Sequence, residues 1–372
     1  MSSKISRRSA IQAASTAAAA VPASLATPSA AAAAPAKWPP DLGDGVPRIC
    51  VISGGGEAQL RQLKQLGVNH VIAGGGGPLP WTEERLRAVM DRYKAGGVSV
   101  INMMIGGFED VIRGGPRRDE QIDKVIQSIR AAGKAGLPVI EYNFYAHRIT
   151  EGYYEELGRG GAGMTAFSHD KVKDLPPLPN EGVHTREDQF KRAEYFLKAI
   201  VPEAVKANVR LAMHPNDPPA PMSRGSEQIM ATFEHWKRYL NLVKSPHNGM
   251  TFDCGVTREL GEDPVAVCKY LGERDVINHI HFRNVMVRKP YVDYAEVFID
   301  EGQVNMFAVM RELVRQKYPR GLYPEHPRAL DIDRNRQDGI VGQYAKVGGG
   351  GFVGEVYNIG YAKAMLQAAL VS

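Results

Sequence analysis

Four apolar, strand-like runs in the second half of the chain each end in a side chain that commonly binds metal ions. The four candidate ligands are His214, Cys254, His281 and Glu325. They lie 40, 27 and 44 residues apart, which is too far for a compact zinc motif. In a (β/α)8 barrel one repeating unit takes roughly 30 residues, and the carboxyl ends of the strands converge on one site. The spacing therefore predicts a parallel β/α fold with a shared site.

These residue types together indicate a bound divalent cation. Imidazole, thiolate and carboxylate ligands favour zinc, manganese or iron. Of the three cysteines, Cys50 and Cys268 lie in apolar runs and are expected to be buried as small hydrophobic residues. Cys254 differs, because it follows a strand and stands between Asp253 and Gly255. The chain is therefore expected to be a metal-dependent enzyme.

Eight strand-like runs alternate with helical patterns along the chain. The expected strands are residues 47–53, 69–73, 98–104, 139–145, 209–214, 249–254, 277–283 and 321–325. Thr82 is expected to cap the helix that ends at Ala95, and residues 146–182 are expected to be irregular. The alternation predicts the α/β class and a single (β/α)8 TIM barrel. A doubly wound sheet is the alternative, but the glycine-rich strand ends at Gly54 and Gly74 lack the phosphate-binding motifs.

The N-terminal segment is expected to be a targeting signal rather than part of the fold. Arg7 and Arg8 precede an alanine-rich apolar run, the pattern of a twin-arginine export signal over residues 1–36. The barrel is then expected at residues 37–372, in the periplasm or outside the cell, with no membrane anchor in the mature form. Without residues 1–36, 43 basic and 41 acidic residues remain, a net charge of +2. Nothing in this balance indicates a nucleic-acid partner.

Several strings resemble the mannonate dehydratase family of the xylose-isomerase-like barrel superfamily. The clearest are His214-Pro-Asn-Asp-Pro-Pro, His281-Phe-Arg-Asn-Val and the segments 141–144 and 194–202. The resemblance implies a divalent ion, Mn²⁺ first with Fe²⁺ and Zn²⁺ as alternatives, held by His214, Cys254, His281 and Glu325. It also implies the dehydration of a small sugar acid, D-mannonate, to 2-keto-3-deoxy-D-gluconate. The sequence allows either a monomer or a homo-oligomer.

Two further residues are expected to take part in catalysis. His326 follows a ligand and is the best candidate to move a proton, while Arg283 could pair with a substrate carboxylate in a bidentate manner. The family's tyrosine before the last helix has no counterpart in residues 348–354, where Tyr344 or Tyr357 would have to substitute, and its histidine in the segment after Glu296 is replaced by Ile299. A sugar isomerase or epimerase on the same barrel, or a non-catalytic sugar-binding paralogue, are therefore the alternative functions.

For other polar side chains near these strand ends, the sequence allows two orientations or two roles. His279 is expected to face away from His281, although a bulge would make it the ligand instead. Asp217 is either a turn residue or a partner of a metal ligand. Glu141 and Asn143 either point into the barrel mouth or have a structural role.

Overall fold

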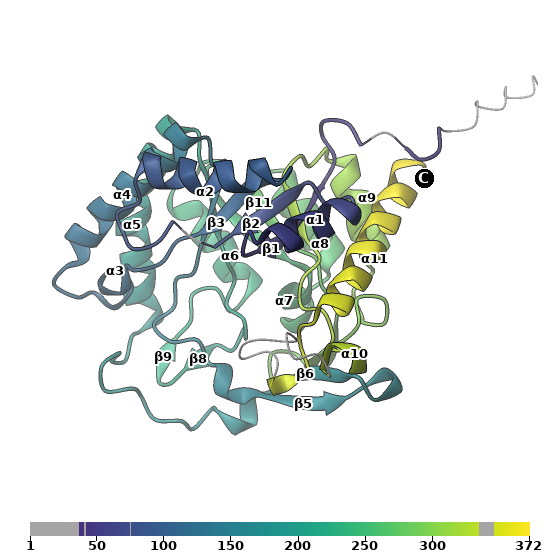
Figure 1. The fold of residues 1–372 in the computed structure, drawn as a ribbon. Helices are drawn as coiled ribbons and strands as arrows, with labels where there is room; N and C mark the ends of the chain where they lie inside the picture. Colours follow the sequence, from purple (N-terminus) through teal and green to yellow (C-terminus); the bar gives the residue numbers. More distant parts are fainter. Residues whose placement is uncertain (1–36, 41, 75, 335–345) are drawn as a thin grey trace, which may run out of the picture. The chain divides into compact units, whose positions relative to one another are not determined.

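The computed structural model describes residues 37–40, 42–74, 76–334 and 346–372 (Figure 1). The chain divides into two compact units, Met1–Trp38 and Pro39–Ser372, and the second contains all the helices and strands below. The export signal expected at residues 1–36 lies outside the described residues, as does Tyr344.

Eight strands form a closed barrel in the order β1-β14-β11-β10-β7-β4-β3-β2, with every neighbouring pair parallel. The strands are β1 (Arg48–Ser53), β2 (His70–Ala73), β3 (Ser99–Met104), β4 (Val139–Tyr142), β7 (Arg210–Met213), β10 (Asn248–Asp253), β11 (Ile277–His281) and β14 (Gly321–Tyr323). The prediction of a TIM barrel is therefore confirmed. All eight expected strands are present, but several end earlier than expected, which matters most at β10.

Helices connect consecutive strands of the barrel, as its parallel order requires, and the last two helices follow the final strand β14. They are α1 (Glu57–Gln65), α2 (Glu83–Ala95), α3 (Glu109–Arg113), α4 (Arg118–Ala135), α5 (Arg186–Ala207), α6 (Phe233–Leu242), α7 (Cys254–Glu259), α8 (Pro264–Gly272), α9 (Met306–Arg315), α10 (Asp331–Arg334) and α11 (Phe352–Leu370). Thr82 caps α2 as expected, because its side chain accepts a hydrogen bond from the backbone N–H of Arg85 at 3.3 Å.

Alternating side chains of each strand belong to two different cores. Val51 of β1 packs into the large cluster that the strands share with the helices, whereas its neighbour Cys50 packs with Ile72 and Ile101 in a small separate cluster. Successive side chains of a strand point to opposite faces, so the small cluster fills the inside of the barrel. Cys50 and Cys268 are both buried and unpaired, as expected for small core residues.

A second, antiparallel sheet was not expected from the sequence. It has the order β12-β13-β6-β5 and consists of β5 (Tyr153–Leu157), β6 (Gly163–Ser168), β12 (Val285–Lys289) and β13 (Asp293–Glu296). Figure 1 shows β5 and β6 at the bottom of the view, apart from the barrel strands. The expectation of an irregular segment at residues 146–182 is wrong at these two strands, because β5 and β6 pair with each other and β6 also pairs with β13, a strand more than 120 residues further along the chain. A two-stranded ribbon, β8 (Met222–Ser223) and β9 (Ser226–Glu227), completes the elements.

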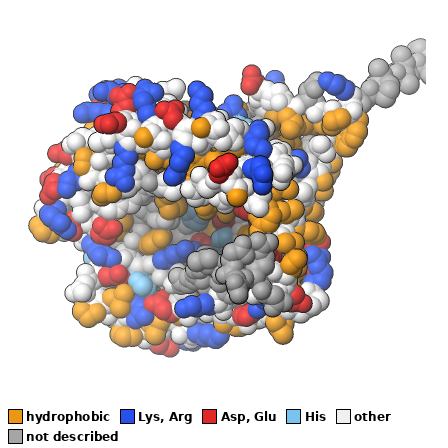
Figure 2. Space-filling view, viewed as in Figure 1, with side chains coloured by type: hydrophobic (Ala, Val, Ile, Leu, Met, Phe, Trp, Pro, Cys, Tyr) orange, Lys and Arg blue, Asp and Glu red, His pale blue; other side chains and the backbone are white. Residues whose placement is uncertain are grey.

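The surface charges and a pocket at the amino ends of the strands do not indicate the functional site. Basic and acidic side chains are interspersed on the face shown in Figure 2. None of the helices in the described part of the chain is long and apolar enough to cross a membrane.

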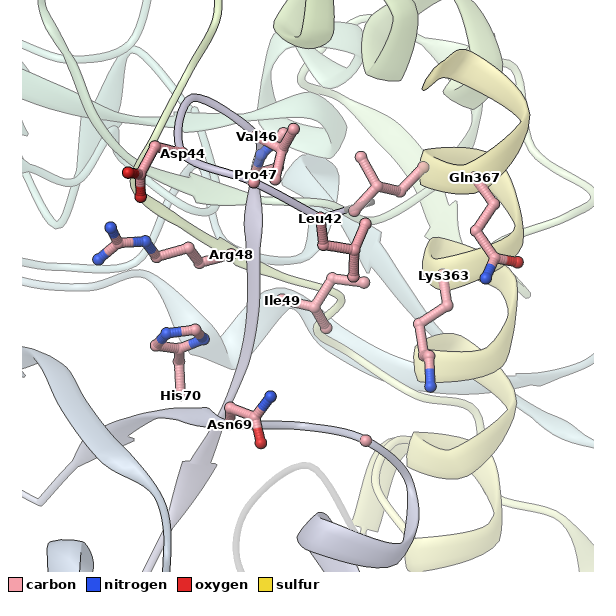
Figure 3. Close-up of a pocket in the computed structure, with 13 residues that line it drawn as sticks. Leu42, Asp44, Val46, Pro47, Arg48, Ile49, Asn69, His70, Lys363 and Gln367 are labelled. Carbon is pink, nitrogen blue, oxygen red and sulfur yellow. The ribbon is translucent and has the colours of Figure 1, made fainter. Parts of the chain in front are cut away.

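A pocket of about 560 Å³ lies between the segment before β1 and α11 (Figure 3). Arg48 and His70, the first residues of their strands, line it, so it opens at the amino ends of the strands. Active sites of TIM barrels lie at the opposite end.

Candidate metal centre and active site

Three of the four predicted ligands converge at the carboxyl end of the barrel. His214 follows β7, His281 is the last residue of β11, and Glu325 lies two residues after β14. The Nδ1 atom of His281 lies 3.1 Å from Nε2 of His214 and 2.9 Å from Oε1 of Glu325. The side chains of His281 and Glu325 are buried, and that of His214 is partly exposed. The strand-end argument therefore placed these residues together correctly.

The fourth strand, β10, contributes Asp253 to this group, and the proposed ligand Cys254 is the next residue along the chain. β10 ends at Asp253, whose Oδ2 is 3.8 Å from Nδ1 of His281, and His214, Asp253 and His281 form one of the groups able to hold a metal ion. Cys254 is already the first residue of α7 and packs in the main hydrophobic core. It belongs to none of the possible metal groups among the described residues. Burial, and after it the neighbouring Asp253 carboxylate, raise the pKa of its thiol well above the usual value.

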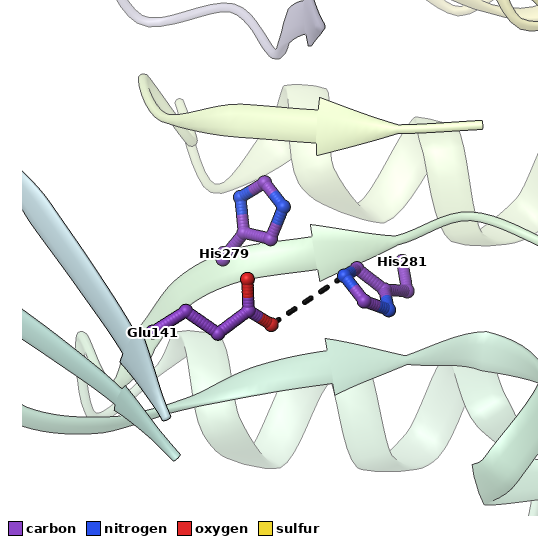
Figure 4. A group of neighbouring side chains, drawn as sticks. All are labelled: Glu141, His279 and His281. Carbon is purple, nitrogen blue, oxygen red and sulfur yellow. Dashed lines mark ion pairs between the residues drawn. The ribbon is translucent and has the colours of Figure 1, made fainter. Parts of the chain in front are cut away.

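A third carboxylate approaches His281 from inside the barrel. Glu141 of β4 lies with Oε1 3.4 Å from Nε2 of His281, and His279 completes this group (Figure 4). The expectation that His279 faces away from His281 is wrong, because residues two apart in a regular strand share a face. Thr251 and Asn102 donate hydrogen bonds to the Glu141 carboxylate at 2.6 and 2.8 Å. The alternative that Glu141 points into the barrel is therefore confirmed.

The charges of this group are strongly coupled. Burial alone would lower the pKa of His281, but Glu325, Glu141 and Asp253 outweigh it and raise that pKa to about 9. Burial lowers the pKa of His279 to about 4. Burial would raise the pKa of Glu325, yet His281, His326 and Arg283 hold it well below the usual value. An ionised carboxylate beside imidazole nitrogens in a buried site is a donor set suited to a divalent cation.

Arg283 lies directly beneath these carboxylates. Its Nε atom is 3.2 Å from both Oδ2 of Asp253 and Oε1 of Glu325, and its Nη1 donates to Glu259 at 2.7 Å. The side chain is only 2% exposed. The sequence predicts a substrate carboxylate as the partner of Arg283; in the structure its partners are the protein's own carboxylates. Arg283 therefore holds Asp253 and Glu325 in position.

A second group, made of Asp217, Glu296 and His326, adjoins the first. Nδ1 of His326 is 3.0 Å from Oε2 of Glu296, and Nε2 is 3.4 Å from Oε2 of Glu325. Burial would lower the pKa of His326, but Glu296 and Glu325 raise it above the usual value. Arg328 donates to the same Glu296 oxygen at 2.8 Å. His326 thus lies between Glu325 of the first group and Glu296 of the second.

Sequence reasoning missed Glu296 as a site residue and left Asp217 undecided. Glu296 ends β13, a strand that was not predicted. Asp217 accepts from Arg148 at 3.1 Å and from the Tyr153 hydroxyl at 2.9 Å, so it belongs to the network around the site. The only available signal was its position in the His214-Pro-Asn-Asp string.

Tyr357, one of the two residues considered in place of the family's tyrosine, and Ile299, which stands where the family has a histidine, contact residues outside these two groups. Tyr357 packs against Phe298, and its hydroxyl interacts with Asp300 and Arg159. Ile299 is buried in the main core. Tyr357 is therefore placed among residues other than those of the two groups.

Comparison with known proteins agrees with this geometry. The chain is 28% identical to the mannonate dehydratase of Streptococcus pneumoniae (strain 70585) over 317 residues, 78% of this chain and 84% of that protein. The mannonate dehydratase of Enterococcus faecalis (strain ATCC 700802 / V583) is 26% identical over 339 residues, 79% of this chain and 89% of that protein.

Solved structures give the same result. The crystal structure of mannonate dehydratase from Streptococcus suis serotype2 matches with a TM-score of 0.74 at 26% identity, covering 87% of this chain and 93% of that one. D-psicose 3-epimerase from Clostridium cellulolyticum H10 shares the fold, with a TM-score of 0.56 at 11% identity over 87% of this chain and 98% of that one. The family model for D-mannonate dehydratase (UxuA) matches residues 180–368, just over half of the chain. The chain belongs to the D-mannonate dehydratase (UxuA) family.

Proposed function

We propose that this protein is a metal-dependent lyase that removes water from a sugar acid, with D-mannonate as substrate and 2-keto-3-deoxy-D-gluconate as product. The observation that carries the proposal is the convergence of donor atoms from four strand ends, His214, Asp253, His281 and Glu325, in a family of dehydratases. In this reaction the C2–H and C3–O bonds break, water leaves, and the resulting enol becomes the keto acid.

The donor set favours Mn²⁺ or Fe²⁺. His214 and His281 offer imidazole nitrogens, and Asp253 and Glu325 offer carboxylate oxygens. Nitrogen and oxygen donors suit these harder ions, whereas thiolates would favour zinc. When bound, such an ion would act as a Lewis acid that offsets the negative charge developing on the substrate carboxylate as C2 loses its proton.

The chain's own residues would position the ligands and move the protons. Arg283 fixes the carboxylates of Asp253 and Glu325 through contacts at 3.2 Å. His326, held by Glu296 at 3.0 Å, is positioned to supply a proton to the departing C3 hydroxyl. Glu296 and Glu325 outweigh burial and raise the pKa of His326, which favours its protonated, acidic form.

The test is direct. Purified protein is stripped of metal, reloaded with Mn²⁺, Fe²⁺ or Zn²⁺, and incubated with D-mannonate and its C2 and C3 epimers while 2-keto-3-deoxy acid is measured. We expect turnover of D-mannonate with Mn²⁺ or Fe²⁺ and none after chelation. Formation of an isomerised sugar without loss of water would indicate an isomerase or epimerase. Binding of sugar acids with no product at all would indicate a sugar-binding paralogue.

We also propose that the protein is exported in folded form through the twin-arginine route. The support is the Arg7-Arg8 pair ahead of the alanine-rich run in residues 1–36. This route would place the enzyme, with its metal already bound, outside the cytoplasm.

A further inference from the structure

A groove extends sideways from the barrel mouth along the ends of β3 and β4. Its inner part has a volume of about 440 Å³ and is lined by residues that include Met104, Asn143 and Arg148. Its outer part, about 490 Å³, reaches Lys124 on α4. Gly106, Gly107 and Glu109 line both parts, so the two cavities adjoin each other along this segment, and we call them together the groove.

The inner end of this groove adjoins the candidate active site. Met104, the last residue of β3, pairs in register with Glu141, whose carboxylate lies 3.4 Å from His281. Arg148 lines the groove and also pairs with Asp217 of the His326 group at 3.1 Å. None of the four proposed metal ligands lines the groove. The groove therefore lies beside the metal ligands and not around them. A substrate bound at the metal ligands could extend into it with its far end.

This side of the barrel mouth is not filled by side chains of the described residues. Gly106 is exposed, and a Cβ atom added there would meet no atom within 4 Å; the same holds for Gly54 after β1 and Gly74 after β2. Two apolar side chains of the barrel strands remain open to solvent, Ile52 at 53% and Met104 at 42%. Apolar surface and open volume next to a polar centre are common features of a ligand site.

The charges along the groove are balanced. Each of its four Lys and Arg side chains already has an acidic partner: Arg113 with Glu181 at 3.0 Å, Arg117 with Asp110 at 3.0 Å, Lys124 with Glu120 at 2.6 Å and Arg148 with Asp217 at 3.1 Å. His147 likewise lies 3.1 Å from Glu151 and 3.2 Å from Glu181. A phosphate or a second acid group would find no uncompensated cation among these residues. A neutral, hydroxyl-rich group can hydrogen-bond to such paired side chains and lie against the apolar ones.

We propose that the groove binds a neutral sugar residue attached to the aldonate, so that the natural substrate is a glycosyl aldonate rather than a free hexonate. The inference rests on the proposed dehydratase function. That reaction uses the carboxylate at C1, the proton at C2 and the hydroxyl at C3, so the sugar must be carried by the oxygen at C4, C5 or C6.

Equilibrium binding tests the groove independently of turnover. The probes are D-mannonate, 4-O-glucosyl-D-mannonate and 6-O-glucosyl-D-mannonate, titrated by calorimetry into the Mn²⁺-loaded protein. We expect one glycosyl derivative to bind at least about tenfold more tightly than D-mannonate. In Gly106→Trp, which fills the groove, we expect that advantage to be lost while D-mannonate binding stays within about threefold of wild type. Gly360→Trp is the matched control, because Gly360 is exposed on α11 and also has open space around it.

The outcomes separate this inference from the proposed function. Tighter, Gly106-dependent binding of a glycosyl aldonate supports the groove even if no keto acid is formed, a result that would overturn only the dehydratase assignment. Turnover of D-mannonate without tighter binding of either glycosyl derivative overturns the groove and leaves the function in place. Equal weakening of all three probes by Gly106→Trp, with Gly360→Trp unaffected, also overturns it, because the substitution would then act on the common acid end.

Discussion

Asp253 and Cys254 are neighbours in the chain but belong to different parts of the structure. The carboxylate of Asp253 lies 3.8 Å from His281, whereas Cys254 packs in the main hydrophobic core, where Cys268 contributes to raising its pKa. The change of environment coincides with the end of β10 and the start of α7. The sequence predicts a thiolate ligand from this strand end, and the structure places the Asp253 carboxylate in the group with His214 and His281, so the two neighbours are alternative ligands.

Substitution of these two neighbours distinguishes the two ligand assignments. Asp253→Asn removes the negative charge while its side-chain oxygen can still cap α7, a role that Asp253 now performs by accepting from Val256 at 2.8 Å. We expect it to weaken Mn²⁺ binding by at least about tenfold, whereas Cys254→Ser should retain the metal. Metal content after dialysis against a weak chelator gives the answer. Loss of metal from Cys254→Ser alone would restore the cysteine as ligand.

His326→Asn tests the proton-transfer assignment. His326 has a positive φ of 47°, a conformation that asparagine tolerates better than most residues, so the backbone should be preserved. A general acid or base contributes about 10²–10⁴-fold, and we expect kcat on D-mannonate to fall by that order with bound metal unchanged. Steady-state kinetics with metal analysis on the same samples measures both. Activity within a few-fold of wild type would show that another group moves the proton.

Arg283→Met tests whether this arginine positions the site or binds the substrate. Removing one partner from a buried ion-pair network costs about 3–5 kcal/mol, because the remaining charges stay buried. We expect a loss of that size in urea denaturation, together with weaker metal binding. Arg210→Met, which breaks a more exposed pair with Asp275, should cost about 1 kcal/mol or less. A stable Arg283 variant that keeps its metal but has a raised KM would instead favour direct contact with the substrate carboxylate.

Glu355 should make folding stability depend on pH. Burial raises its pKa from 4.5 to about 7 in the folded chain, so the folded state binds this proton more tightly than the unfolded state. Its contribution is therefore most favourable below about pH 4.5 and is lost as the pH rises through 7. We expect Glu355→Gln to stabilise the protein by up to about 3 kcal/mol near pH 8.5 and to have little effect near pH 4.5.

Urea denaturation at both pH values measures this difference. Glu57→Gln is the matched control, since Glu57 is an exposed glutamate in the first turn of α1. An equal effect of Glu355→Gln at the two pH values would contradict the assignment.

Replacement of Arg7 and Arg8 by lysine tests the export proposal. Twin-arginine signals are recognised through this pair, so the double variant should remain in the cytoplasm as precursor. Cell fractionation with an antibody to the barrel shows where the protein accumulates. Unchanged delivery of processed protein outside the cytoplasm would contradict a twin-arginine signal.

Local patterns explain why the fold could be predicted. Apolar alternation and helical periodicity involve residues close together in the chain, so the eight strands and their order were readable, and with them the approach of His214, His281 and Glu325. The end of a strand is less well determined by such patterns. At β10 the strand ends at Asp253, one residue before the predicted ligand Cys254, and local patterns do not distinguish these two neighbours.

The amino-acid sequence by itself determined the barrel, the strand ends that meet at its mouth and the kinds of donor atoms available there. Only the tertiary structure decided which carboxylates join the histidines, that Glu296 reaches His326 from the second sheet, and that Arg283 is enclosed by the protein's own acidic groups. These contacts join segments that are far apart in the chain. Their distances depend on the closure of the barrel and on the packing of the second sheet beside it, and no local pattern contains that information.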